Sequence, residues 1–144
     1  MKNILVTIDF DRHEQLLIDK AFELAEKFNS KIWIMHIADP NPDFVGYEAG
    51  PQSVRDSLAS KLKKEHRLLE EYSNALKKKG IKAEGLLIQG GTIEMIMEES
   101  KKLHIDLIIA GHQEHSFLYK ALFGSVSRKI VKNSKIPVLI VPLD

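Results

Sequence analysis

The chain alternates between short apolar runs and longer segments of helical periodicity. Five runs are long enough to form strands, at residues 4–8, 31–38, 83–88, 106–110 and 137–141. Three of them are almost continuously apolar, as expected for strands that are covered on both faces. Between them, apolar residues recur three and four positions apart, which predicts amphipathic helices over residues 17–28, 54–76, 93–103 and 126–131.

This βαβαβαβαβ order predicts an α/β fold. Strands that alternate with helices form an open parallel sheet with right-handed crossovers and helices on both faces. A length of 144 residues and a hydrophobic share of 44% suit one domain over residues 1–144.

Composition excludes several classes of partner. The 21 basic and 20 acidic residues leave a net charge of +1, so no chain-wide field attracts nucleic acid or an anionic membrane. Cysteine is absent, which removes disulfides and thiolate chemistry and fits a reducing compartment. No segment has the pattern of a signal peptide or a membrane span. We therefore expect a cytoplasmic protein that binds neither nucleic acid nor membrane.

Two polar segments have simple interpretations. Lysines cluster at 61–64 and 77–79 on the long second helix, and interleaved acids such as Glu65 and Glu70 indicate a solvated face. Residues 39–51 contain three of the five prolines and form a long irregular connection. Such a segment is either a surface excursion or a lid that presents Phe44 and Tyr47 to a ligand.

Candidate chemistry lies where the predicted strands end, because open parallel sheets bind ligands at the carboxyl ends of their strands. No phosphate-binding loop of the Walker type and no G-x-G-x-x-G motif is present. Gly111 ends the fourth strand, where a bare backbone lets a ligand approach closely. Gly124, Ser125 and Ser127 open the last helix, whose free N–H groups favour an anion. Asp11 is the predicted N-cap of the first helix.

Three stretches of the chain carry a resemblance to a known family. Asp106–Gly111 (DLIIAG), Gly124–Ser127 (GSVS) and Ile136–Pro142 (IPVLIVP) resemble the C-terminal half of universal stress proteins. Asp9 after the first strand and His36-Ile37 near the end of the second also fit. The nucleotide-binding branch of that family carries G-x2-G-x9-G-[ST], which here falls on Gly111, Glu114, Gly124 and Ser125.

The resemblance implies a Rossmann-like sheet of order 3-2-1-4-5 and an adenine nucleotide (ATP, AMP or ADP) as ligand. Asp9 and the backbone of Ile37 would face the adenosine, with Thr7 and Ala110 lining its pocket. The ribose and phosphates would lie against the following residues: Gly111, Gly124, Ser125, Val126 and Ser127. It also implies a role in stress response and a homodimer through the last strand, Ile136–Val141, whose apolar edge needs a cover.

Glu114 departs from the family pattern, because it replaces the second glycine. A carboxylate 4 Å from a phosphate charge costs about 1 kcal/mol in water and about 4 kcal/mol at an effective dielectric near 20. A bound Mg²⁺ would reverse the sign of this effect. Two functions thus stay open: a nucleotide-binding regulatory module, and a nucleotide-free stress protein that acts through protein contacts.

Catalysis and metal binding have weaker support. Ser125 and Ser127 would lie near a triphosphate, but no general base is recognisable, so at most slow ATP hydrolysis or autophosphorylation is expected and no catalytic residue is assigned. His112 and His115 flank Glu114 without a third placed ligand, so no metal site is predicted.

Overall fold

The computed structural model describes residues 1–10, 13–38, 52–89, 93–112 and 129–143. Strands and helices alternate in the predicted order, and residues 129–133 are helical before the last strand. The elements are β1 (Asn3–Ile8), α1 (Glu14–Phe28), β2 (Lys31–Ala38), α2 (Gln52–Lys78), β3 (Ala83–Gln89), α3 (Ile93–Lys102), β4 (Leu107–His112) and β5 (Val138–Pro142).

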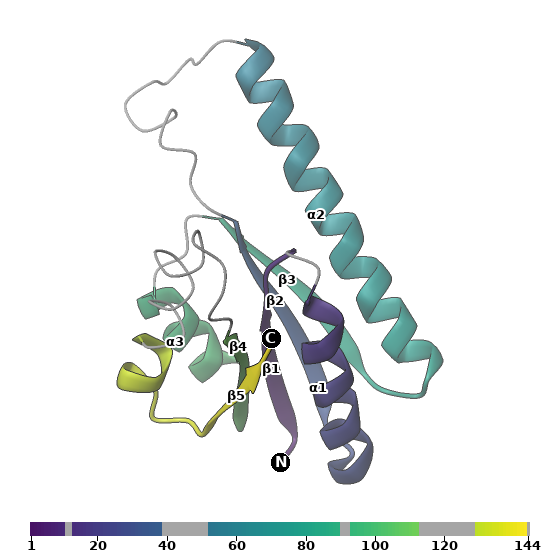
Figure 1. The fold of residues 1–144 in the computed structure, drawn as a ribbon, viewed down its shortest axis with the longest axis vertical. Coiled ribbons are helices and arrows are strands. Elements are labelled where there is room, and N and C mark those ends of the chain that lie inside the picture. Colours follow the sequence, from purple (N-terminus) through teal and green to yellow (C-terminus); the bar gives the residue numbers. More distant parts are fainter. Residues whose placement is uncertain (11–12, 39–51, 90–92, 113–128, 144) are drawn as a thin grey trace.

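The five strands form one sheet of order β3-β2-β1-β4-β5, and all four strand pairs are parallel. This confirms the α/β, Rossmann-like fold. α1 and α2 lie on one side of the sheet, and α3 and the helical residues 129–133 lie on the other (Figure 1). β1 is central, with β2 beside it in one direction and β4 in the other.

Each face of the sheet carries its own apolar core, because side chains alternate between the two faces of a strand. Ile4, Val6 and Ile34 belong to the cluster under α1 and α2. Leu5, Met35 and Ile108 belong to the cluster that includes Ile96 of α3 and Ile130. All six strand residues are 0% exposed, so the centre of the sheet is sealed on both sides.

The helix ends correct some of the sequence-based expectations. α1 begins at Glu14 with His13 as its N-cap, so Asp11, which lies outside the described residues, is not the cap. Phe28, which was predicted to belong to the apolar stripe of α1, is the last residue of that helix. Its side chain is 54% exposed and therefore lies outside the core. Gly80, at φ +84°, follows the end of α2 and has the left-handed backbone that stops a helix. Val131 is also exposed, so it is not part of the core stripe expected for the last helix.

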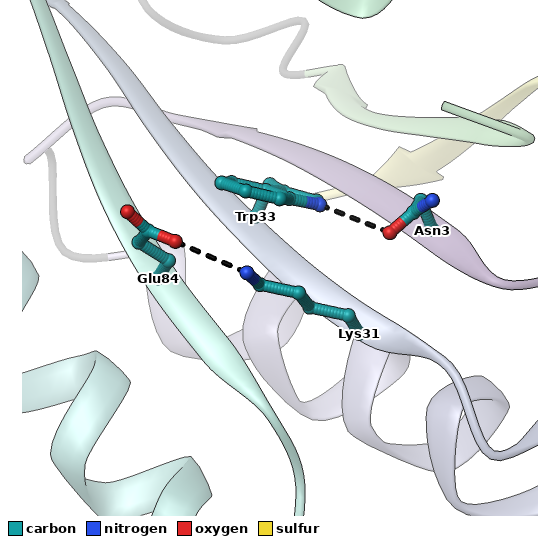
Figure 2. A network of polar contacts seen from close by, with 4 residues as sticks. All are labelled: Asn3, Lys31, Trp33 and Glu84. Atoms are coloured by element: carbon teal, nitrogen blue, oxygen red, sulfur yellow. Dashed lines mark hydrogen bonds and ion pairs between the residues drawn. The ribbon is translucent and has the colours of Figure 1, made fainter. Parts of the chain in front are cut away.

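Polar contacts tie the strands together near the amino end of the sheet (Figure 2). The Trp33 indole N–H donates to Asn3 Oδ1 at 3.2 Å, which links β2 to β1. Lys31 Nζ lies 3.8 Å from the centre of the Trp33 ring and 3.1 Å from Glu84 Oε2 on β3. Three neighbouring strands are thus joined at the edge of the sheet opposite to the carboxyl ends.

Within the described ranges, no helix combines the length and the apolar character that crossing a lipid bilayer requires. α2 is long enough, with 27 residues, but charged side chains cover its outer face, including the exposed Lys63, Lys64 and Arg67.

Candidate functional site

The strand order reverses direction at β1, and this places the ends of β1 and β4 side by side. After β1 the chain continues to β2 and β3 on one side, and it then returns to β4 and β5 on the other. The carboxyl ends of two such strands border the crevice in which open parallel sheets bind ligands. Asp9 follows β1 directly, and Gly111 and His112 end β4.

Thr7 joins the two strands at this point. The register pairs Val6 with Ile109, and the Thr7 hydroxyl donates to the Ile109 carbonyl at 3.3 Å. By alternation, Thr7 and Ala110 project to the same face of the sheet as Leu5 and Ile108. Thr7 is half-buried and Ala110 is 1% exposed. The described residues therefore bring these two predicted pocket residues together on neighbouring strands.

Ile37 and Asp9 complete the described part of the predicted site. Ile37 pairs with Ile88 on β3 and packs partly against the core on the α3 face. Asp9 is half-buried, one residue beyond Ile8, which is the partner of His36 in the sheet. Both lie at the carboxyl edge of the central strands, as the sequence predicted.

Gly111 has a packing role that sequence reasoning missed. A Cβ atom at this position would lie 2.6 Å from Leu143 Cδ1 and 3.4 Å from Leu17 Cδ1. Both leucines belong to the core on the α1 face. The contact with Leu143 is too short for a side chain unless that leucine moves, whereas the contact with Leu17 is of ordinary length. The missing side chain at Gly111 therefore leaves room for Leu143 on the α1 face. This role is additional to the close approach of a ligand that the sequence suggested.

The remaining predicted residues, Glu114, Gly124, Ser125, Val126 and Ser127, lie outside the described residues. The same holds for His115 and for the proposed lid at residues 39–51. Among the described residues, no group of three or more acidic or histidine side chains has the arrangement of a metal site.

A buried His36–Glu65 pair behind the carboxyl edge was not predicted. His36 Nε2 lies 3.3 Å from Glu65 Oε2, and His36 Nδ1 lies 3.0 Å from the Ile8 carbonyl oxygen. The two residues are only 5% and 8% exposed. Glu65 was assigned to a solvated face, and this assignment is wrong because α2 packs that position against β2.

The sequence contained a signal for this pair. The spacing of the α2 leucines predicts one helical stripe, formed by Leu58, Leu62, Leu69 and Leu76. Position 65 lies three residues after Leu62 and four before Leu69, so it falls on the same stripe. A carboxylate within an apolar stripe requires a partner when it is buried. The histidine of the second strand supplies that partner.

A shallow groove of about 390 Å³ also runs between α2 and β3. Its rim carries both signs of charge, from Glu70, Lys77 and Glu84, and these side chains are exposed. Because positive and negative side chains are mixed on its rim, the groove has no net positive potential that would attract an anionic ligand.

Comparison with known proteins gives a consistent result. The model of the universal stress protein family matches residues 1–142. The chain is 29% identical over 143 residues to universal stress protein YxiE of Bacillus subtilis, and the match covers 96% of this chain and 97% of that protein.

Two solved structures share the fold. A universal stress protein family member from Arabidopsis thaliana with AMP bound has a TM-score of 0.64 at 21% identity, with 100% of this chain and 93% of that one covered. The universal stress protein from Archaeoglobus fulgidus in complex with dAMP has a TM-score of 0.60 at 18% identity, with 97% of each chain covered.

Proposed function

Because this chain belongs to the universal stress protein family, we propose that it binds an adenine nucleotide at the carboxyl edge of its sheet. The observation that carries the proposal is the junction of β1 and β4, where Thr7, Asp9, Ala110 and Gly111 meet at the point of reversed strand order. The AMP and dAMP complexes of relatives with the same fold support it.

The proposed roles are those that the family resemblance implies for these residues. Asp9 accepts hydrogen bonds from the adenosine, beside the backbone of Ile37, while Thr7 and Ala110 form the wall of the pocket. Gly111 begins the phosphate segment, which continues through Gly124, Ser125, Val126 and Ser127. Backbone N–H groups at the start of a helix are suited to phosphate oxygens. ATP is the proposed ligand, with AMP or ADP as alternatives, and occupancy would regulate affinity for a partner in the stress response.

Glu114 decides how a triphosphate is accommodated. Its carboxylate weakens binding unless a Mg²⁺ ion lies between it and the phosphates. We therefore propose that ATP binds with Mg²⁺ and that AMP, which carries fewer charges, depends less on the metal.

Thermal melts of the wild type and of Glu114→Gly test the proposal. Each protein is measured with Mg·ATP, with ATP in EDTA, and with AMP. Ligand at 100 times its dissociation constant stabilises the native state by about 2.7 kcal/mol, a rise of roughly 5–10 °C for a domain of this size. Asp9→Ala serves as the control for the adenosine end of the site. No shift in any variant at millimolar nucleotide would refute nucleotide binding.

The second candidate function is favoured by Glu114 itself. If the carboxylate has displaced the phosphates, the protein acts without nucleotide, through protein contacts. A thermal shift in Glu114→Gly and none in the wild type is the result that this alternative predicts.

We also propose a cytoplasmic homodimer through the last strand, Ile136–Val141. β5 is an edge strand, and its Val138 to Val141 side chains are apolar and half-buried. An apolar edge is normally covered by another strand. Ile140→Lys should shift the sedimentation coefficient to that of a monomer, whereas Gln89→Lys on the opposite edge strand β3 should leave it unchanged. A wild type that sediments as a monomer at high concentration would disprove the dimer.

A further inference from the structure

We propose that the buried His36–Glu65 pair is the device that positions Asp9 for the nucleotide. This inference rests on the proposed function and assigns a role to two residues on the opposite face of the sheet. The imidazole touches the chain on both sides of Asp9. His36 Nδ1 lies 3.0 Å from the Ile8 carbonyl oxygen, and the Phe10 ring packs on the imidazole with its centroid at 4.6 Å.

The first contact determines the tautomer of His36. A carbonyl oxygen only accepts hydrogen bonds, so Nδ1 carries a proton and donates it to Ile8. That carbonyl belongs to the peptide group that links Ile8 to Asp9. The direction of the first backbone bond of Asp9 is therefore tied to the orientation of the imidazole ring.

Glu65 holds the imidazole in this state. Its Oε2 atom is buried and has no hydrogen bond of regular geometry among the described residues, so the 3.3 Å contact with His36 Nε2 is the interaction that compensates its burial. The contact is attractive when either Nε2 or the carboxyl group carries a proton, because two bare acceptors would repel each other. In both forms Nδ1 keeps its own proton, and the bond to Ile8 is preserved.

Stability alone does not account for such a pair. A buried ion pair is often no more stabilising than apolar side chains of the same volume. The neighbours of Glu65 in the α2 stripe, Leu62 and Leu69, show that leucine fits this face of the helix. What the polar pair adds is a defined orientation of the imidazole ring. A hydrogen-bonding group at one ring nitrogen fixes the tautomer of functional histidines in the same way.

Two substitutions at one position separate orientation from packing. In Glu65→Gln the side-chain amide donates to a bare Nε2, so the Nδ1–H tautomer and the bond to Ile8 remain. In Glu65→Met the shape is kept, but the Ile8 carbonyl alone now favours the Nδ1–H tautomer, so a larger part of the population carries its proton on Nε2 and loses the Ile8 contact. The chain offers a matched control in the exposed His66–Glu70 pair of the same helix, at 3.6 Å, tested as Glu70→Met.

Three measurements on the full chain decide the proposal: the imidazole ¹⁵N spectrum of His36, the amide resonance of Asp9, and the affinity for AMP by calorimetry. We expect Glu65→Met to mix the His36 tautomers, move the Asp9 resonance and weaken AMP binding by about three- to ten-fold. Glu65→Gln should bind within about two-fold of the wild type, because its amide N–H donates to Nε2 and so keeps the Nδ1–H tautomer. Glu70→Met should change nothing.

The outcomes are distinct from those of the proposed function. If the wild type binds AMP and Glu65→Met binds it equally well, the positioning role is overturned and nucleotide binding stands. If the wild type does not bind AMP, the proposed function fails. The spectra without nucleotide then still test whether the pair orients Asp9. An Asp9 resonance that does not move in Glu65→Met overturns the positioning role. If Glu65→Met does not fold, the apolar double variant His36→Met/Glu65→Met replaces it. Its Asp9 resonance and its affinity for AMP are measured and interpreted as for Glu65→Met.

Discussion

Leu143 occupies the space that a side chain on Gly111 would need. The Leu143 Cδ1 and Cγ atoms lie 2.6 Å and 3.1 Å from the position of a Cβ atom built on Gly111. Leu143 follows β5 and is 6% exposed, and its N–H donates to the His112 carbonyl at 2.8 Å. The last two residues of β4, Gly111 and His112, therefore both contact the residue that closes the core after the last strand.

Gly111→Ala should lower the free energy of unfolding by about 1–2 kcal/mol, because the added methyl group forces Leu143 or the β4 backbone to move. Urea denaturation measures the loss. Leu143→Ala removes the clash, so the double variant should be less destabilised than the sum of the two single variants. Strict additivity would show that Leu143 is not what Gly111 accommodates.

Tyr72 should make the protein less stable at high pH. Burial of the ring and the hydrogen bond to Glu14, with Oη to Oε1 at 3.0 Å, raise the pKa of Tyr72 to about 12. The folded state thus holds this proton more tightly than the unfolded chain, whose tyrosine titrates near 10. The contribution is complete below about pH 10 and is lost as the pH rises toward about 12.

The free energy of unfolding should fall more steeply between these pH values in the wild type than in Tyr72→Phe. Lysines titrate in the same range in both proteins, so only the difference between the two curves reports on Tyr72. Parallel curves would mean that the phenol has no raised pKa.

Asp106 should stabilise the fold except in acid. Backbone N–H groups of Asn3 and Lys2 donate to its Oδ2 at 3.0 Å and 2.7 Å, and these bonds hold the pKa of Asp106 below its ordinary value of 3.8. A lowered pKa gives stability that is present above the unfolded value and lost as the pH falls through the folded one.

Asp106→Asn should therefore lower the free energy of unfolding at pH 7 by about 1 kcal/mol or less, since water screens this exposed carboxylate. The difference from the wild type should vanish below the folded pKa. Urea titrations at pH 7 and in acid measure both values, and a difference that persists in acid would contradict the charge-based explanation.

Lys31 should report on the strand contacts of Figure 2 through fluorescence. Trp33 is the only tryptophan in the chain, so its emission is unambiguous. Lys31→Met removes the cation over the indole ring and the ion pair with Glu84, and it should cost about 0.5–1 kcal/mol of stability. The Trp33 emission maximum should shift, whereas it should not in Lys82→Met, an exposed position near the same end of β3. Identical spectra for the two variants would rule out the contact in solution.

Much of the candidate site was predictable because its residues follow strands. Asp9, Ile37 and Gly111 come at or just beyond the ends of apolar runs, and parallel strands bring their carboxyl ends to one edge of the sheet. Their place on the central strands came from the family resemblance, since the runs alone do not specify strand order. Glu114 and Gly124 to Ser127 stay predictions, outside the described residues.

The sequence by itself determined the alternation of strands and helices and the family, because periodicity and local motifs are properties of neighbouring residues. It did not determine the partners of buried polar residues. Position 65 falls within the apolar stripe of α2, but only the packing of α2 on β2 placed Glu65 against His36. Gly111 was likewise assigned to the ligand alone until Leu143, 32 positions later in the chain, was found against it. Contacts between residues far apart in the chain depend on how the helices pack on the sheet, and the pattern of residues along the chain does not specify this packing.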